Sequence, residues 1–354
     1  MKRILSLIIA IVFLSNLSGC SNKKATKTNT DSSVESVSEN TSASSVESLS
    51  SSEESSSSSP SSVSSVSSSS SKVSVSSAIS SVNSVSSNSS VQTNNTFTGL
   101  PALPQIKYTV NDPLNTRGIS TAGRGFGFGA AENGVPHSIT VNNQNYFDSL
   151  NSNALAWDNK SGEKILYLTF DCGYPYQDLV PRILKTLKEK QVKSAFFLTM
   201  QYLKEAPHEV ATMINDGHIV GNHTVNHPDC TQISREKLAD ELLGIDNYLR
   251  TKFGYTSKYF RYPSGRHSEN TIDLIKGLGY RTVFWSIAHT DWDPKNQPGV
   301  EKSFKTVTER LHPGAVILLH STSPDNVEIL GRFIDYAINE GYTFKTLDDY
   351  KYWN

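Results

Sequence analysis

The feature that most constrains the fold is a regular alternation of apolar and amphipathic segments after residue 164. Short apolar runs predict buried strands, and the segments between them repeat apolar residues with a helical period. This order predicts a parallel sheet with right-handed crossovers, arranged as a barrel or distorted barrel, with an open doubly wound sheet as the alternative. Strands are expected at 165–170, 194–199, 218–222, 258–261, 280–286 and 315–320, with a short one near Thr343, and helices at 177–190, 206–216, 233–252, 268–278, 300–311 and 324–340.

Residues 1–20 have the layout of a secretory signal, with Lys2 and Arg3 followed by a short apolar core and small residues. The core is short for a membrane-spanning helix, although a single membrane anchor is the alternative. The closing "LSGC" resembles the bacterial lipobox, and the resemblance implies cleavage before Cys20 and lipidation of its thiol. We therefore expect an extracytoplasmic lipoprotein, held on the cell membrane and facing the cell wall.

Two segments of different composition precede the alternation. Residues 21–96 are dominated by Ser and lack aromatic residues, which predicts a disordered linker, either a leash toward the cell wall or a simple spacer. Residues 97–163 are rich in Gly, Asn and Pro and predict an irregular extension that packs on the barrel of residues 164–354. Their "GRGFGFG" lacks the preceding strand and the spacing of a phosphate loop, and the net charge of -1 creates no field for nucleic acid. We therefore expect neither nucleotide nor nucleic acid as a partner.

Polar side chains follow five of the predicted strands. Because the carboxyl ends of parallel strands meet at one edge of a sheet, we expect these side chains to lie close together. They are Asp171 in "LTFDCGY", His223 and His227 in "GNHTVNHPD", Arg261 in "FRYPSG", Asp291 in "HTDWD" and His320 in "LLHS".

His223 and His227 are four residues apart, so one turn or tight loop can direct both imidazoles toward a divalent ion such as Zn²⁺. Two unrelated surface or core histidines are the alternative. Gly221 before the pair and Pro228 after it indicate a fixed loop, which favours metal binding.

Beside a metal, Asp171 would be a general base, and Arg261 would keep it ionised. His320 would be a general acid with its pKa raised by Asp291. The alternatives are a structural carboxylate at 171 and a core histidine at 320. Together these groups suit hydrolysis of an amide or ester with a small acyl group.

Three further residues complete the predicted site. Trp292 and Leu319 would form the wall of a small apolar pocket for a methyl group, and a backbone N–H such as that of Ser264 would stabilise the oxyanion.

The ordered motifs "TFDCGY", "HTVNHP", "RYPSG", "DW" and "LLH" resemble those of the NodB-like polysaccharide deacetylases, carbohydrate esterase family 4, over about residues 164–348. The resemblance implies a distorted (β/α) barrel, one ion of the Zn²⁺ or Co²⁺ type, and removal of acetyl groups from N-acetylated sugars. It also implies the roles given above to Asp171, the two histidines, Arg261 and the Asp291–His320 pair.

Cys172 departs from the family, which usually has a second Asp there as the third metal ligand. The thiol is a thiolate ligand, a bystander, or the mark of a degenerate site. The stretches "TVFWSIAHTDWD", "HPGAVILLHS" and "GYTFKTLDD" resemble the branch that deacetylates N-acetylmuramic acid in peptidoglycan. The predicted substrate is therefore muramic acid in peptidoglycan. The alternatives are N-acetylglucosamine polymers and a catalytically dead glycan-binding lipoprotein.

Overall fold

The computed structural model describes residues 96–354. The predicted signal segment, the lipidation of Cys20 and all but the last residue of the Ser-rich linker lie outside the described residues. Within the described range, no helix is both long and apolar enough to cross a membrane.

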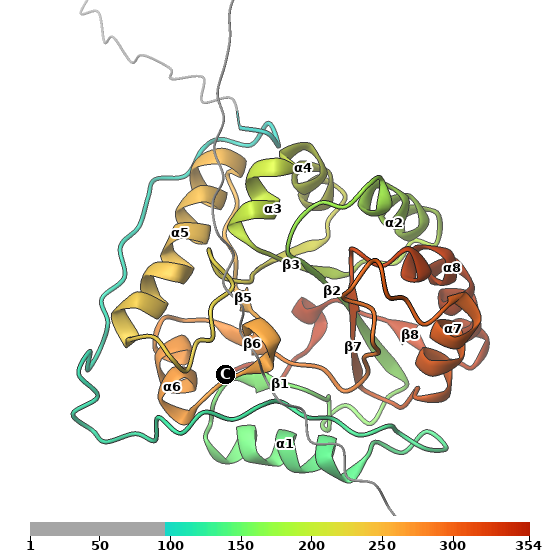
Figure 1. Ribbon diagram of the computed structural model, residues 1–354, viewed down its shortest axis with the longest axis horizontal. Helices are drawn as coiled ribbons and strands as arrows, with labels where there is room; N and C mark the ends of the chain where they lie inside the picture. Colours follow the sequence, from blue (N-terminus) through green and yellow to red (C-terminus); the bar gives the residue numbers. More distant parts are fainter. Residues whose placement is uncertain (1–95) are drawn as a thin grey trace, which may run out of the picture. The chain divides into compact units, whose positions relative to one another are not determined.

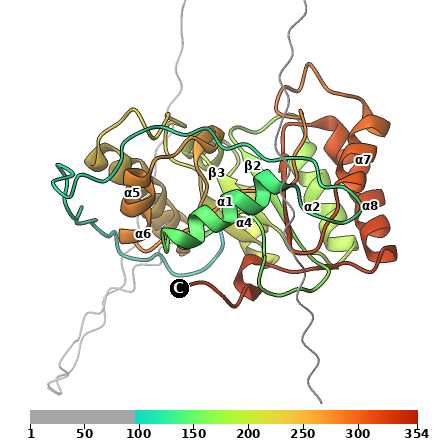
Figure 2. The same ribbon diagram turned by 90° about the horizontal axis from the view of Figure 1, so that it is seen from below.

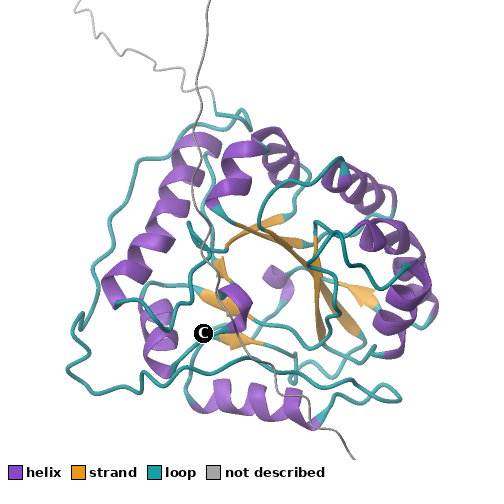
Figure 3. Cartoon of the chain, in the orientation of Figure 1, coloured by secondary structure: helices purple, strands orange, loops and turns teal. Residues whose placement is uncertain are grey.

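The core of the fold is an eight-stranded sheet whose named strands all pair in parallel, surrounded by helices (Figures 1 and 3). The strand order is β1-β6-β5-β4-β3-β2-β7, and β8 pairs with β2. The strands are β1 Ala154–Leu155, β2 Ile165–Cys172, β3 Ala195–Leu198, β4 Ile219–Asn222, β5 Tyr259–Phe260, β6 Arg281–Val283, β7 Ala315–His320 and β8 Thr343–Phe344.

Isolated bridges join the two ends of this strand order. Ile287, after β6, pairs in parallel with Ile317 of β7, and the Leu318 N–H donates to the Ile287 carbonyl at 2.9 Å. Trp157, after β1, forms an antiparallel bridge with Ala315. The sheet therefore curves into a distorted barrel, which confirms the predicted fold and excludes the open sheet.

The helices follow the predicted alternation, and Figure 1 shows them around the outside of the sheet. One short helix, α3, was not predicted as a separate element. The helices after β2 are α2 Leu179–Glu189, α3 Met200–Glu205, α4 Pro207–Asn215, α5 Arg235–Phe253, α6 Glu269–Gly277, α7 Val300–Glu309 and α8 Pro324–Asn339.

The alternation of side chains along β2 divides the core into two layers. Leu168, Phe170 and Cys172 belong to the cluster that includes apolar residues of the outer helices. Tyr167 belongs to a separate cluster with residues of the neighbouring strands. Because successive side chains of a strand point to opposite faces, Asp171 shares its face with Tyr167 and lies opposite Cys172.

The segment 97–163 contains more regular structure than predicted. It includes α1 Ser138–Ser149, visible across the barrel in Figure 2, and strand β1, which pairs with β6. The sequence of α1 gave little signal, because its buried residues include polar Thr140 and Gln144. Strand β1 has only two residues, too few for a periodic pattern.

The Gly-rich run within this segment packs closely on the barrel. Phe126 stacks on Phe284 with ring centroids 4.5 Å apart, and Arg124 forms a bridge with His267. Gly265 has a φ of +65°, and a Cβ there would lie 2.7 Å from the Cβ of Phe126. A side chain at 265 is thus disfavoured by both backbone conformation and space.

Candidate active site

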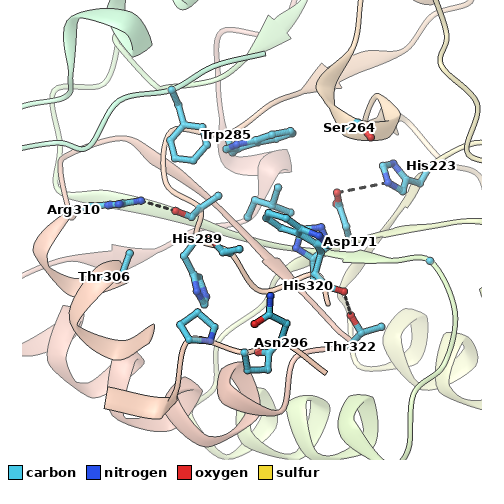
Figure 4. Close-up of a pocket in the computed structure, with 18 of the residues that line it drawn as sticks. Asp171, His223, Ser264, Trp285, His289, Asn296, Thr306, Arg310, His320 and Thr322 are labelled. Atoms are coloured by element: carbon cyan, nitrogen blue, oxygen red, sulfur yellow. Dashed lines mark hydrogen bonds and ion pairs between the residues drawn. The ribbon is translucent and has the colours of Figure 1, made fainter. Parts of the chain in front are cut away.

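The predicted strand-end residues meet around one pocket of about 880 Å³ at the carboxyl edge of the sheet (Figure 4). Asp171 comes from the end of β2, His320 ends β7, and both line the pocket. The two histidines of the loop after β4 line it too. Arg261 and Asp291 stand behind these residues, fully buried.

Asp171 is held by a buried guanidinium. Arg261 Nη1 donates to Asp171 Oδ1 at 2.8 Å, and Arg261 Nη2 donates to Thr169 Oγ1 at 2.8 Å. Burial opposes ionisation of Asp171, but the charge of Arg261, aided by His223 and His320, outweighs it and lowers the pKa of Asp171. The carboxylate is therefore ionised and oriented, as a general base requires.

The backbone fixes the tautomer of His223. Its Nδ1 lies 2.9 Å from the Arg261 carbonyl oxygen, an acceptor, so Nδ1 carries the proton and donates it. The lone pair of Nε2 then faces the pocket, 3.6 Å from Asp171 Oδ2 (Figure 4). The rings of His223 and His227 lie 5.0 Å apart between centroids.

The loop that carries the histidine pair is held in an unusual conformation. Thr224 and His227 have φ angles of 71° and 52°, and the Thr224 hydroxyl accepts from the His227 N–H at 3.0 Å. Glu241 of α5 accepts from the backbone and the side chain of Asn226 at 2.8 and 2.7 Å. Glu241 was not identified from the sequence, where it is one acidic residue of an amphipathic helix.

The histidine pair fits a divalent metal ion. Burial lowers the pKa of His223 to about 4 and also lowers the pKa of His227, so both rings are neutral and able to ligate near pH 7. Within residues 96–354, no group of three His, Cys, Asp or Glu side chains is arranged to hold a metal. The residues present therefore offer two imidazole nitrogens and leave the other positions to water or substrate.

The structure does not bring Cys172 to this pair. The residue is fully buried in the apolar cluster with Phe170, does not line the pocket, and has a thiol whose pKa is raised by burial. Because Asp171 and Cys172 point to opposite faces of β2, only the carboxylate reaches the pocket. The predicted role of Cys172 as a metal ligand is therefore corrected to that of a bystander packed in the core.

His320 is paired as predicted from its motif. Its Nδ1 lies 2.7 Å from Asp291 Oδ1, and its backbone N–H donates to Asp291 Oδ2 at 2.8 Å. Burial opposes protonation of His320, but the charge and the hydrogen bond of Asp291 prevail and raise its pKa. His320 is thus suited to donate a proton.

Two residues next to Asp291, Asn326 and the pocket-lining His289, were not identified from the sequence. Asn326 of α8 donates through Nδ2 to Asp291 Oδ2 at 2.6 Å, so its Oδ1 is the atom that lies 2.9 Å from His289 Nε2. This order fixes the amide of Asn326 and places a proton on His289 Nε2. Both residues lie outside the five motifs.

The predicted substrate contacts need one correction. Ser264 and Trp292 line the pocket, and Trp292 is 59% exposed. Leu319 does not line it: the residue is 1% exposed and packs in the outer core, whereas Leu318 faces the pocket. The alternation of side chains along β7 explains why Leu318 replaces Leu319 in the pocket, because residues 318 and 320 share a face.

A parallel β/α barrel with an ionised carboxylate, a histidine pair and a carboxylate-bound imidazole at its strand ends defines a barrel hydrolase. Residues 158–283 match the family model described as polysaccharide deacetylase. The chain is 40% identical over 188 residues to the peptidoglycan-N-acetylmuramic acid deacetylase PdaA of Bacillus subtilis, covering 53% of this chain and 71% of that protein. The chain belongs to the polysaccharide deacetylase family, carbohydrate esterase family 4.

Two further comparisons agree with this assignment. The solved structure of Bacillus subtilis PdaA, a family 4 carbohydrate esterase, superposes with a TM-score of 0.61 at 35% identity, covering 65% of this chain and 97% of that one. A peptidoglycan-N-acetylglucosamine deacetylase of Bacillus cereus is 32% identical over 188 residues, covering 51% of this chain and 66% of that protein.

Proposed function

We propose that the protein is a metal-dependent de-N-acetylase that removes acetyl groups from N-acetylmuramic acid in peptidoglycan. The observation that carries the proposal is the placement of Asp171, His223, His227 and His320 around one pocket, with Asp171 and His320 each bound to a buried charged partner. A base held ionised and an acid whose pKa is raised are the two groups that amide hydrolysis needs.

Each group has one task in this reaction. A divalent cation such as Zn²⁺ or Co²⁺ at the two imidazoles would polarise the acyl carbonyl and acidify water. Asp171 accepts a proton from the attacking water, and Arg261 keeps the carboxylate in place. His320 donates a proton to the departing sugar nitrogen, while Asp291 stabilises the imidazolium. Ser264 contributes a backbone N–H to the developing oxyanion, and Leu318 with Trp292 borders the acetyl methyl group.

Support for muramic acid comes from the relatives. The protein matched at 40% identity is named for N-acetylmuramic acid, and the one matched at 32% is named for N-acetylglucosamine. Deacetylation of N-acetylglucosamine polymers is therefore the second candidate. A dead glycan-binding module is disfavoured, because the proton-transfer groups keep geometry that binding alone does not need.

The location of the protein is also a proposal. The "LSGC" segment and the Ser-rich stretch after it suit a lipid anchor at Cys20 and a long tether to the cell wall. Mass spectrometry of the protein purified from membranes is expected to find residue 20 at the N-terminus with a lipid on its thiol. A protein that keeps residues 1–19, or an unmodified Cys20, would contradict lipid anchoring.

The function is tested by mass spectrometry of peptide-free glycan strands incubated with the protein and Zn²⁺ or Co²⁺. Loss of acetyl located on muramic acid, absent with Asp171→Asn, is the expected result. Loss confined to N-acetylglucosamine would establish the second candidate. Binding without turnover on either sugar would overturn the enzymatic assignment.

A further inference from the structure

The pocket extends well beyond the catalytic groups, along one face of α7. Lys302, Thr306 and Arg310 all line it. They are spaced four residues apart, so they form one stripe along α7 and its end. Figure 4 shows Thr306 and Arg310 on the side of the pocket away from Asp171 and His223.

This stripe is cationic. Within residues 96–354, neither Lys302 nor Arg310 has a carboxylate within 4.0 Å, whereas Lys305 elsewhere on α7 pairs with Glu309 at 3.6 Å. Among the described residues that line the pocket, Asp171 is the only carboxylate, and its charge is already matched by Arg261. The stripe therefore presents uncompensated positive charge to whatever fills this part of the pocket.

Arg310 is fixed at the edge of this space. Its Nη1 donates to the carbonyl of Ala288, another residue that lines the pocket, at 2.7 Å. The side chain is half-buried, so an anion there would meet a partly desolvated charge. A guanidinium held in place and short of an anionic partner is well suited to bind a carboxylate.

We propose that Lys302, Thr306 and Arg310 form an anion subsite that takes the lactyl carboxylate of a muramic acid unit in the glycan. The inference rests on the proposed deacetylase function and deepens it, because it identifies the part of the site that distinguishes muramic acid from glucosamine. Muramic acid carries a lactyl ether whose carboxylate is ionised near pH 7, and N-acetylglucosamine lacks it. The subsite thus makes the pocket selective for glycan with a free carboxylate.

The test uses two substrates that differ only in charge: peptide-free glycan oligomers with intact lactyl carboxylates, and the same oligomers with those groups reduced to alcohols. For the full-length protein with Zn²⁺, we expect a KM about tenfold lower for the intact oligomers. In the Lys302→Gln/Arg310→Gln double variant, this preference should fall to about one, while Arg310→Lys retains part of it. Lys305→Gln is the matched control and should keep the full preference.

Two results would overturn the subsite. One is a wild-type protein with the same KM for both substrates. The other is a double variant whose KM rises by the same factor for both substrates, so that the preference remains. Calorimetric binding of the two oligomers separates this outcome from failure of the proposed function. Tighter binding of the intact oligomer that depends on Lys302 and Arg310 supports the subsite even where no acetyl is released. Equal binding of the two oligomers contradicts the subsite even where acetyl is released.

Discussion

Arg261, a fully buried side chain, donates to Asp171 at 2.8 Å and fixes the charge of the carboxylate at the end of β2. Three of its other N–H groups are also bound: Nε donates to the Val283 carbonyl at 2.9 Å, and Nη2 donates to Thr169 Oγ1 and to the Phe284 carbonyl. Its guanidinium carbon lies 4.2 Å from the centroid of the Phe197 ring. The ion pair therefore joins the proposed general base to the barrel core, and removing one partner is expected to lower stability.

Arg261→Met is expected to destabilise the protein by about 3 kcal/mol, because it leaves Asp171 as an unpaired buried charge. The double variant Arg261→Met/Asp171→Asn should recover a large part of this loss, since no charge then remains. The free energies of unfolding in urea, measured for both variants and for Asp171→Asn, test the coupling. Additive losses in the double variant would contradict it.

The pH dependence of the same pair has a definite sign. The pKa of Asp171 is lowered in the folded protein, so the pair stabilises the fold above the ordinary carboxyl pKa near 4 and the stability is lost as the pH falls through the folded pKa. The wild type should lose more stability between pH 5 and pH 3 than Asp171→Asn does, by about 1 kcal/mol. Equal acid sensitivity of the two proteins would show that Asp171 does not contribute.

Asp291→Asn is expected to move the alkaline limb of the activity profile to lower pH. Asp291 raises the pKa of His320 against the effect of burial, so without this charge the general acid loses its proton at lower pH. We expect kcat at the pH optimum to fall by about 10² to 10⁴. The pH dependence of kcat on a fixed glycan, with circular dichroism as a check on folding, measures both effects.

Asn326→Ala is the companion variant, because the uncharged amide of Asn326 donates to Asp291 Oδ2 at 2.6 Å and to the His320 backbone carbonyl at 3.1 Å. We expect a smaller loss of kcat than in Asp291→Asn, with the alkaline limb of the activity profile again moved to lower pH. An alkaline limb that stays in place in Asp291→Asn would contradict the assignment of His320 as the acid.

The barrel could be predicted because apolar strands and amphipathic helices alternate repeatedly along the sequence after residue 164. Strands such as 315–320 and 165–170 are long apolar runs, and parallel pairing brings their polar ends together. Strand β1 could not be found in this way, because it has two residues and is defined by pairing with β6. Its existence depends on tertiary contacts that a local pattern does not encode.

The errors at Cys172 and Leu319 have one physical origin. A motif gives the order of residues, but the side on which a side chain emerges is fixed by the register of the strand, and neighbours emerge on opposite faces. Asp171 and His320 line the pocket, so Cys172 and Leu319, the residues next to them, belong to the outer core. Residues such as Asn326 and Glu241 carry no motif and act only through hydrogen bonds seen in the fold.

Leu318→Ala and Leu319→Ala are expected to behave in opposite ways. Leu319 is buried in the outer core, so its truncation should cost about 2 to 5 kcal/mol of stability and leave kcat/KM of the folded fraction nearly unchanged. Leu318 lines the pocket, so its truncation should lower kcat/KM for acetylated glycan about tenfold. Thermal unfolding and steady-state kinetics on both variants test this prediction. A Leu319→Ala protein that loses kcat/KM while Leu318→Ala loses only stability would place the acyl contact at Leu319.

The final prediction concerns metal binding and separates the histidine pair from the thiol next to Asp171. His227→Ala should weaken Zn²⁺ or Co²⁺ binding at least tenfold in calorimetry, because it removes one of two imidazole nitrogens. Cys172→Ser should change the metal affinity by no more than about twofold, because residue 172 lies on the face of β2 away from the pocket. The same substitution should destabilise the fold by about 1 to 3 kcal/mol, because it buries a hydroxyl among apolar side chains. Loss of metal affinity in Cys172→Ser with unchanged stability would instead establish the thiol as a ligand and require the end of β2 to rearrange when metal binds.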